Sequence, residues 1–140
     1  YRLMRDESED RELRLSAVRY FGRYPYEKAR SVLIRLATDK EALHWEYAAV
    51  AAGALKDYDG EDVISALKSA LYSSNWYVRY NAAVSLEARG LSYSHLIDVM
   101  SGDDRYAREM MEYRFQERRL MEEPGPQGEG SVRGERGRGA

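Results

Sequence analysis

The sequence predicts an all-α protein built from repeated helix pairs. Similar segments recur about every 30 residues, and apolar residues within them fall three or four positions apart. No stretch alternates with the two-residue period of a β-strand. Four similar segments begin at Asp10, Ala42, Asn75 and Asp104, so their starts lie 32, 33 and 29 residues apart. Helix pairs at this period cannot bury their apolar faces alone, so they must stack into one array.

The four segments predict the first helix of each repeat and a final helix. They read DRELRLSAVRYF, ALHWEYAAVAAG, NWYVRYNAAVSL and DRYAREMMEYRF. The fourth position is apolar in each segment (Leu13, Trp45, Val78 and Ala107), and the eighth is small or apolar (Ala17, Ala49, Ala82 and Met111). A spacing of four keeps these residues on one helix face, which we expect to pack in the core.

A second helix is predicted after each of the first three segments, over residues 26–37, 61–72 and 94–102. Their apolar residues again fall at helical spacing, as in Val63, Leu67 and Leu71. Short segments with proline, glycine or capping residues separate the paired helices, at Tyr24-Pro25, 57–62 and 89–94. These segments predict tight turns.

Polar residues at the helix starts form a second repeated pattern. Asp or Asn at such a position can accept the free N–H groups of the first turn and can also reach an arginine one turn on. The pairs Asp10/Arg14, Asn75/Arg79 and Asp104/Arg108 fit this arrangement. The second segment carries Ala42 and Glu46 instead, so a polar ladder through the repeats is interrupted there. Its run AAVAAGAL, residues 48–55, predicts the most buried helix.

The chain divides into one repeat domain, residues 1–122, and a tail. We place the repeats at about 9–40, 41–73 and 74–102, followed by a capping helix over 104–122, because an end repeat needs a polar outer face. Residues 123–140 are rich in glycine, proline and arginine with one aliphatic side chain, which predicts a disordered tail.

Composition limits the possible functions. Lys and Arg number 22 against 24 Asp and Glu, giving a formal net charge of −2 and no overall field to attract polyanions. With no cysteine, thiolate chemistry and disulfides are excluded. No apolar run reaches the roughly 18 residues that span a bilayer, so we expect no membrane insertion by these residues. We expect a cytoplasmic protein, and because the chain opens on Tyr1, an upstream segment could add a membrane tether.

The repeated segments resemble HEAT repeats, most closely the bacterial HEAT-like, PBS-lyase-type branch. The first helix of that branch commonly reads Asp-x-x-Val-Arg-x-x-Ala-Ala-x-x-Leu. NWYVRYNAAVSL matches it with Asn75 in place of Asp, and with Val78, Arg79, Ala82, Ala83 and Leu86. The resemblance covers about Glu9 to Leu120. It implies an armadillo-like fold, a right-handed α-solenoid of about three helix pairs plus a C-terminal capping helix.

Catalytic and metal-binding motifs are weak. The acidic turn over residues 57–62 has only Asp57 and Asp59 before Gly60, too few oxygen ligands for a calcium loop. His44 and His95 lack the paired spacing of zinc or iron sites. No nucleophile elbow is present. We therefore predict no enzyme activity, no metal and no cofactor.

The stretch around Trp76 has two interpretations. Trp76, Tyr77, Arg79 and Tyr80 could stack on nucleotides, but they also fit the repeat, with Trp76 and Tyr77 packed on the turn between repeats. We favour the structural interpretation. The twelve tyrosines of the chain suit either a protein interface or the edges between repeats, and the sequence leaves this open.

The sequence predicts a non-catalytic scaffold that binds another protein. In such solenoids the second helices line the inner curve, so the resemblance implies contacts from Glu27, Arg30, Arg35, Glu61, Ser65, Lys68, Ser94 and Asp98. Their mixed charges favour a protein partner over nucleic acid. Two alternatives stay open by resemblance: an accessory subunit of a bilin-lyase-like modifying enzyme, and a nucleic-acid-binding protein like HEAT-like base-excision glycosylases.

Overall fold

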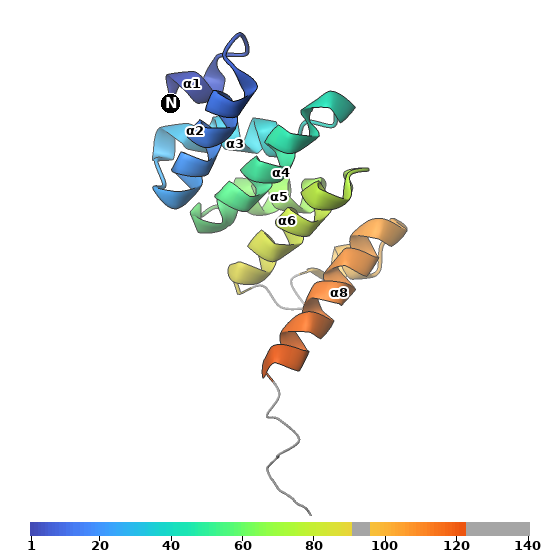
Figure 1. The fold of residues 1–140 in the computed structure, drawn as a ribbon. Helices are drawn as coiled ribbons and strands as arrows, with labels where there is room; N and C mark the ends of the chain where they lie inside the picture. Colours follow the sequence, from blue (N-terminus) through green and yellow to red (C-terminus); the bar gives the residue numbers. More distant parts are fainter. Residues whose placement is uncertain (91–95, 123–140) are drawn as a thin grey trace, which may run out of the picture.

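The fold is all-α across the residues that the structure, a computed structural model, describes: 1–90 and 96–122. The α-helices are α1 (Arg2–Arg5), α2 (Arg11–Arg23), α3 (Arg30–Ala37), α4 (Trp45–Ala54), α5 (Glu61–Ala70), α6 (Trp76–Ala88), α7 (Ile97–Met100) and α8 (Arg105–Glu122). Three short 3-10 turns precede α3, precede α4 and follow α4, at η1 (Glu27–Ala29), η2 (Ala42–His44) and η3 (Leu55–Asp57). The predicted solenoid is confirmed (Figure 1).

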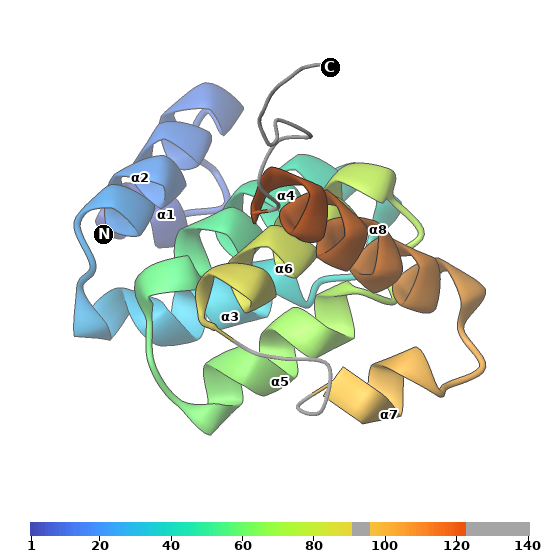
Figure 2. The same ribbon diagram turned by 90° about the horizontal axis from the view of Figure 1, so that it is seen from below.

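The helices form two layers. Figure 2 shows α2, α4, α6 and α8 in one layer, and α3, α5 and α7 in the other. We call these the first-helix layer and the second-helix layer. Within them, α4 makes its most extensive contacts with α6, α2 and α3, so the middle repeat joins its neighbours.

Side-chain caps begin three of the first helices, as the sequence predicts. Asp10 accepts the N–H groups of Glu12 and Leu13 at 3.0 and 3.3 Å. Asn75 likewise accepts from Tyr77 and Val78 at 2.9 and 3.3 Å, and Asp104 accepts from Ala107 at 2.9 Å. Each cap satisfies N–H groups that the helix itself leaves free.

The predicted register is wrong by two residues in the second repeat. The extra turn η2 moves the start of α4, so that His44, and not Ala42, takes the N-cap place of Asp10 and Asn75. Ala48 then takes the place of Arg14 and Arg79. The shift leaves Trp45 37% exposed, and Leu13 of α2 is also 47% exposed, so the expected core positions of both residues are wrong.

The predicted contact between each cap and its arginine is also wrong. The arginines instead donate to carbonyl groups of the chain that enters each helix. Arg14 donates to the Met4 carbonyl at 3.1 Å, Arg79 to that of Ser73 at 2.8 Å and Arg108 to that of Gly102 at 2.8 Å. A planar guanidinium satisfies these carbonyls, which have no partner within a helix, and so fixes the preceding turn.

Aromatic rings of the following repeat cover two of these arginines. The Arg14 guanidinium lies 4.6 Å from the centroid of the Tyr47 ring in α4. Arg79 lies 5.0 Å from that of Tyr106 in α8. A guanidinium over a ring face is attracted by the ring's electron density, so each arginine connects its own turn to the next repeat.

Alanine dominates the centre of the core. Five of the ten α4 residues are buried, the same share as in α3, so the structure does not set α4 apart as the most buried helix that the sequence predicts. The buried side chains of α4 are Ala48, Ala49, Ala51, Ala52 and Ala54. Larger apolar residues of α2, α3, α5 and α6 surround them, including Val18, Leu33, Leu67 and Leu86. Small side chains let the neighbouring backbones approach closely, and such a core tolerates little added volume.

Buried and half-buried side chains also bond to backbone carbonyls across the repeats. Ser85 and Asn81 of α6 donate to the carbonyls of Ala52 and Ala49 in α4, at 2.7 and 2.8 Å. Tyr58 donates to the Phe21 carbonyl at 2.7 Å and accepts from the Tyr26 amide at 3.0 Å. Burial raises the pKa of Tyr58, so its hydroxyl stays a donor at neutral pH.

The third repeat differs most from its prediction. Its second helix is α7, only four residues long, whereas the sequence predicts residues 94–102. The helix ends where Gly102 and the Asp104 cap start the entry into α8, and Ser101 Oγ donates back to the Ile97 carbonyl at 2.5 Å. Residues 94 and 95, part of the turn 89–94 and the tail 123–140 lie outside the described residues.

We predict opposite effects of alanine at two helical glycines. A Cβ on Gly22 would lie 2.8 Å from both Cα and Cβ of Ala54, whereas one on Gly53 meets only the Asn81 amide at 3.9 Å. Alanine favours a helix by about 1 kcal/mol over glycine, but overpacking costs about 1–3 kcal/mol. We expect Gly22→Ala to lower the melting temperature by several degrees and Gly53→Ala to raise it or leave it unchanged. Equal effects would show that α2 and α4 do not pack this closely.

Candidate functional site

The predicted contact residues lie on the second-helix layer. Ser94 falls outside the described residues, and the other seven lie on η1, α3, α5 and α7. Among these seven, Glu27, Arg35, Glu61, Ser65 and Asp98 are exposed, while Arg30 and Lys68 are half-buried. The structure therefore places them on one layer, but with different access to a partner.

Ion pairs between repeats occupy Arg30 and Lys68. Arg30 pairs with Asp62 of the next repeat at 3.1 Å and with Glu27 at 2.8 Å, and donates to the Asp59 carbonyl. Lys68 donates to both carboxylate oxygens of Asp98 at 3.0 Å, which lowers the pKa of Asp98. These two cations connect successive second helices, so their first role is within the array.

A cluster of aromatic side chains occupies the first-helix layer. The rings of Trp76 and Tyr80 are stacked, with centroids 4.9 Å apart and an interplanar angle of 12°. Tyr77 stacks on Trp45 of the preceding repeat at 5.7 Å. Trp76 is 47% exposed and Tyr77 58% exposed, so the expectation that they pack on the turn between repeats is only partly met. Ring contacts support these side chains, yet each presents a large surface to solvent.

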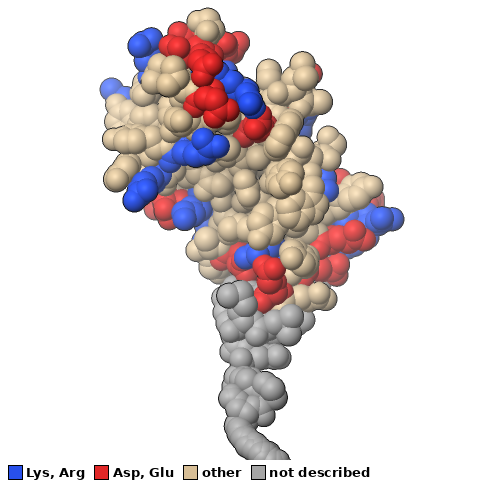
Figure 3. Space-filling view, in the orientation of Figure 1, with Lys and Arg blue, Asp and Glu red and all other residues tan. Residues whose placement is uncertain are grey.

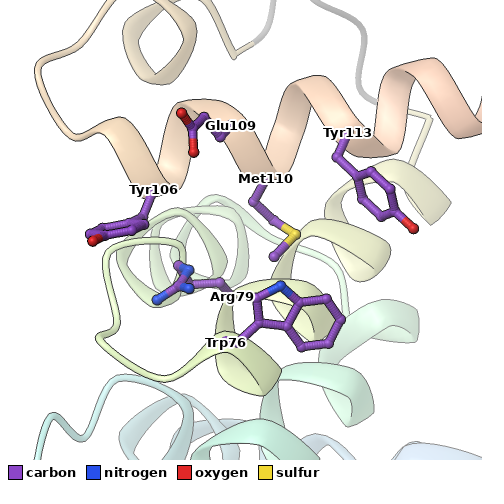
Figure 4. Close-up of a pocket in the computed structure, with 6 residues that line it drawn as sticks. All are labelled: Trp76, Arg79, Tyr106, Glu109, Met110 and Tyr113. Carbon is purple, nitrogen blue, oxygen red and sulfur yellow. The ribbon is translucent and has the colours of Figure 1, made fainter.

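The cluster borders a groove between α6 and α8 (Figure 4). We call it the aromatic groove; it has a volume of about 360 Å³ and is lined by Trp76, Arg79, Tyr106, Glu109, Met110 and Tyr113. Met110 points toward the Trp76 ring, while Glu109 turns toward solvent and pairs with Arg105 at 3.3 Å. Apolar and aromatic surface with a few polar groups at its edge is typical of binding grooves.

Arg79 fixes one end of the aromatic groove. Its side chain is nearly buried, donates to the Ser73 carbonyl and lies against the Tyr106 ring. Because both the carbonyl and the ring hold it, this cation positions Tyr106 and is not free to bind a nucleotide phosphate. Arg79, the basic residue of the aromatic stretch, therefore has a structural role, in line with the interpretation that the sequence favours.

A polar network fixes the other end. Arg114 of α8 pairs with Glu87 of α6 and with Glu117, and donates to the Tyr80 hydroxyl at 3.2 Å. Tyr113 donates to Glu117 at 3.0 Å, and this carboxylate raises the pKa of Tyr113. Glu87 and Arg114 are largely buried, so the pair holds α8 against α6 in a defined position.

The other candidate sites serve local structure. In the acidic turn, Gly60 adopts φ +130°, the Asp59 carbonyl accepts from Arg30, and Asp62 accepts from the Val63 amide at 2.9 Å. His44 Nδ1 lies 2.7 Å from Asp39 Oδ2, and His95 lies outside the described residues. Across residues 1–90 and 96–122, no three metal-ligating side chains gather.

The sequence did not identify the α8 side of the groove. Tyr106, Met110 and Tyr113 were predicted only as parts of a capping helix. A helix that only caps the array does not need three large side chains on one face. Their spacing of four and three residues is the signal that could have indicated a binding surface on α8.

The model of the HEAT-repeat family matches residues 2–87, more than half of the chain. The chain belongs to the HEAT-repeat family. The match runs from α1 almost to the end of α6, so α8 lies beyond it. No curated protein matches the chain. HEAT repeats generally act as scaffolds for protein interactions, and no described helix of this HEAT-repeat chain meets the length and apolarity needed to cross a bilayer.

We predict that Arg114→Ala weakens the docking of α8. The change leaves Glu87 largely buried without its partner, which we expect to cost about 2 kcal/mol of unfolding free energy. Arg105→Ala on the same helix removes the exposed pair with Glu109 and a distant contact with the Tyr106 ring, and should cost less than about 0.5 kcal/mol. Urea unfolding of both variants measures the difference. Equal values would show that the buried pair does not hold α8.

Proposed function

We propose that this HEAT-repeat chain is a non-catalytic scaffold that binds another protein through the aromatic groove and the adjacent ring cluster. The observation that supports this most strongly is the half-exposed set Trp76, Tyr106 and Tyr113, which lines one groove from two helices. Large exposed aromatics that lie together are uncommon on a surface without a partner, and tyrosine and tryptophan dominate the binding energy of protein interfaces.

The rigidity of the groove supports this function. The arginine–ring contact at Arg79 and the Arg114 network hold both ends, and stacking holds Trp76 against Tyr80. A partner would therefore meet side chains that are already ordered, which lowers the entropy cost of association.

The second-helix layer is a proposed secondary contact surface. Glu27, Arg35, Glu61 and Ser65 are exposed there and could meet the same partner or another one. Arg30, Lys68 and Asp98 also lie there, but their pairs within the array favour a structural role. Ser94, which lies outside the described residues, stays a predicted contact.

The two alternatives give different outcomes in simple assays. An accessory subunit of a bilin-lyase-like enzyme would bind a chromophore, and a tetrapyrrole in the aromatic groove would quench Trp76 fluorescence. A nucleic-acid-binding protein would bind oligonucleotides with a strong dependence on salt. We propose neither alternative. Arg79, the cation beside the rings of the groove, is already held by the Ser73 carbonyl and the Tyr106 ring, so it is not free to bind an anionic ligand.

Site-specific photo-crosslinking tests the proposed surface. We would place a photoreactive phenylalanine at Tyr106 in one variant and at Tyr20 in another, since both positions carry exposed tyrosines but only Tyr106 lines the groove. We expect one protein from the source lysate to crosslink at position 106 and not at 20, and Trp76→Ala to abolish that product. A product formed equally at both positions, or one that survives Trp76→Ala, would exclude the groove as the binding site.

A further inference from the structure

A second groove crosses the first-helix layer at the other ends of the helices. It has a volume of about 550 Å³ and is lined by Arg19, Gly22 and Arg23 of α2, Val50, Gly53 and Ala54 of α4, Lys56 of η3 and Asn81 of α6. None of these residues lines the aromatic groove. We call this surface the basic groove.

The basic groove carries positive charge without a counter-charge among its lining residues. Arg19, Arg23 and Lys56 are exposed, and no Asp or Glu lines the groove. Within the described part of the chain, Arg19 and Lys56 make no ion pair, and Arg23 contacts only the Tyr24 ring, at 5.9 Å. Figure 3 shows lysine and arginine side chains on the α2 side of the molecule, with acidic side chains among them. This contrasts with Arg30 and Lys68 of the second-helix layer, which are paired.

The floor of the basic groove consists of small residues. Ala54 fills the space beside Gly22 and so closes the junction of α2 and α4, while at Gly53 no side chain rises from the helix surface. A partner backbone can therefore approach α4 closely at Gly53. Asn81 donates its amide N–H to the Ala49 carbonyl at 2.8 Å, which leaves its amide oxygen to accept an N–H from a ligand.

We propose that the basic groove binds an acidic segment of another polypeptide. Three unpaired cations around a small-residue floor match carboxylates spaced along a peptide, and the Asn81 oxygen matches a peptide N–H. Nucleic acid fits less well: no aromatic ring lines this groove to stack on bases, and the chain carries a net charge of −2. The proposal concerns a different surface from the aromatic groove and does not depend on it.

Fluorescence anisotropy with a labelled glutamate-rich decapeptide tests the proposal. We expect the full chain to bind the peptide at about 50 mM salt and to release it as salt rises. The double variant Arg19→Gln/Lys56→Gln should weaken binding by about tenfold or more. The matched control Arg2→Gln/Lys28→Gln removes the same charge from exposed residues outside the groove and should bind like the parent.

Three results would overturn the proposal. The first is no binding of the decapeptide by the parent chain. The second is an equal loss in both double variants, which would indicate a response to net charge alone. The third is tighter binding of an oligothymidylate of the same length that depends on Arg19 and Lys56, which would assign the groove to nucleic acid. Circular dichroism melting of both variants confirms that exposed substitutions leave the fold intact.

Discussion

The close approach of adjacent first helices is the constraint on which this array depends. Gly22 of α2 lies directly against Ala54 of α4, and the buried face of α4 is almost entirely alanine. At this distance, side chains of one repeat reach the backbone of the one before it, as Ser85 and Tyr58 do in bonding to the carbonyls of Ala52 and Phe21. Small residues thus stabilise the array indirectly, by bringing hydrogen-bonding groups within reach.

The same constraint influences where the large side chains lie. Because alanine and glycine fill the closest contact between α2 and α4, the large rings lie toward the helix ends: Trp45, Trp76 and Tyr77 at the starts of α4 and α6, and Tyr20 and Phe21 near the end of α2. Tyr77 stacks on Trp45 of the preceding repeat, and Trp76 stacks on Tyr80 and meets Tyr77 edge to face, while both Trp76 and Tyr77 stay exposed. Stability and recognition are divided between two parts of the same layer: the alanine interface holds the helices, and the ring cluster is available to a partner. The basic groove depends on the same constraint, because its floor is formed by small residues of the interface between α2 and α4.

The sequence predicted the helices and their caps well, because Asp10, Asn75 and Asp104 act locally on the next turn. It failed where the decisive partner is a backbone group. The arginines bond to backbone carbonyls of preceding residues. Every residue carries a carbonyl, so the pattern of side chains does not indicate which one an arginine binds. The predicted register of α4 was wrong because nothing in the sequence of Ala42 to His44 distinguishes a 3-10 turn from the start of an α-helix. The aromatic groove was missed because it joins two segments whose contact depends on how α8 packs.

Amide hydrogen exchange, resolved by residue or short peptide, tests the central claim that the α4 interface holds the array together. If it does, the amides of α4 open only with global unfolding and exchange slowest, those of α2 and α6 follow, and those of α8 exchange faster because α8 contacts the array on one side only. Exchange in α4 as fast as in α8, or a slowest segment within the second-helix layer, would contradict this account of the fold.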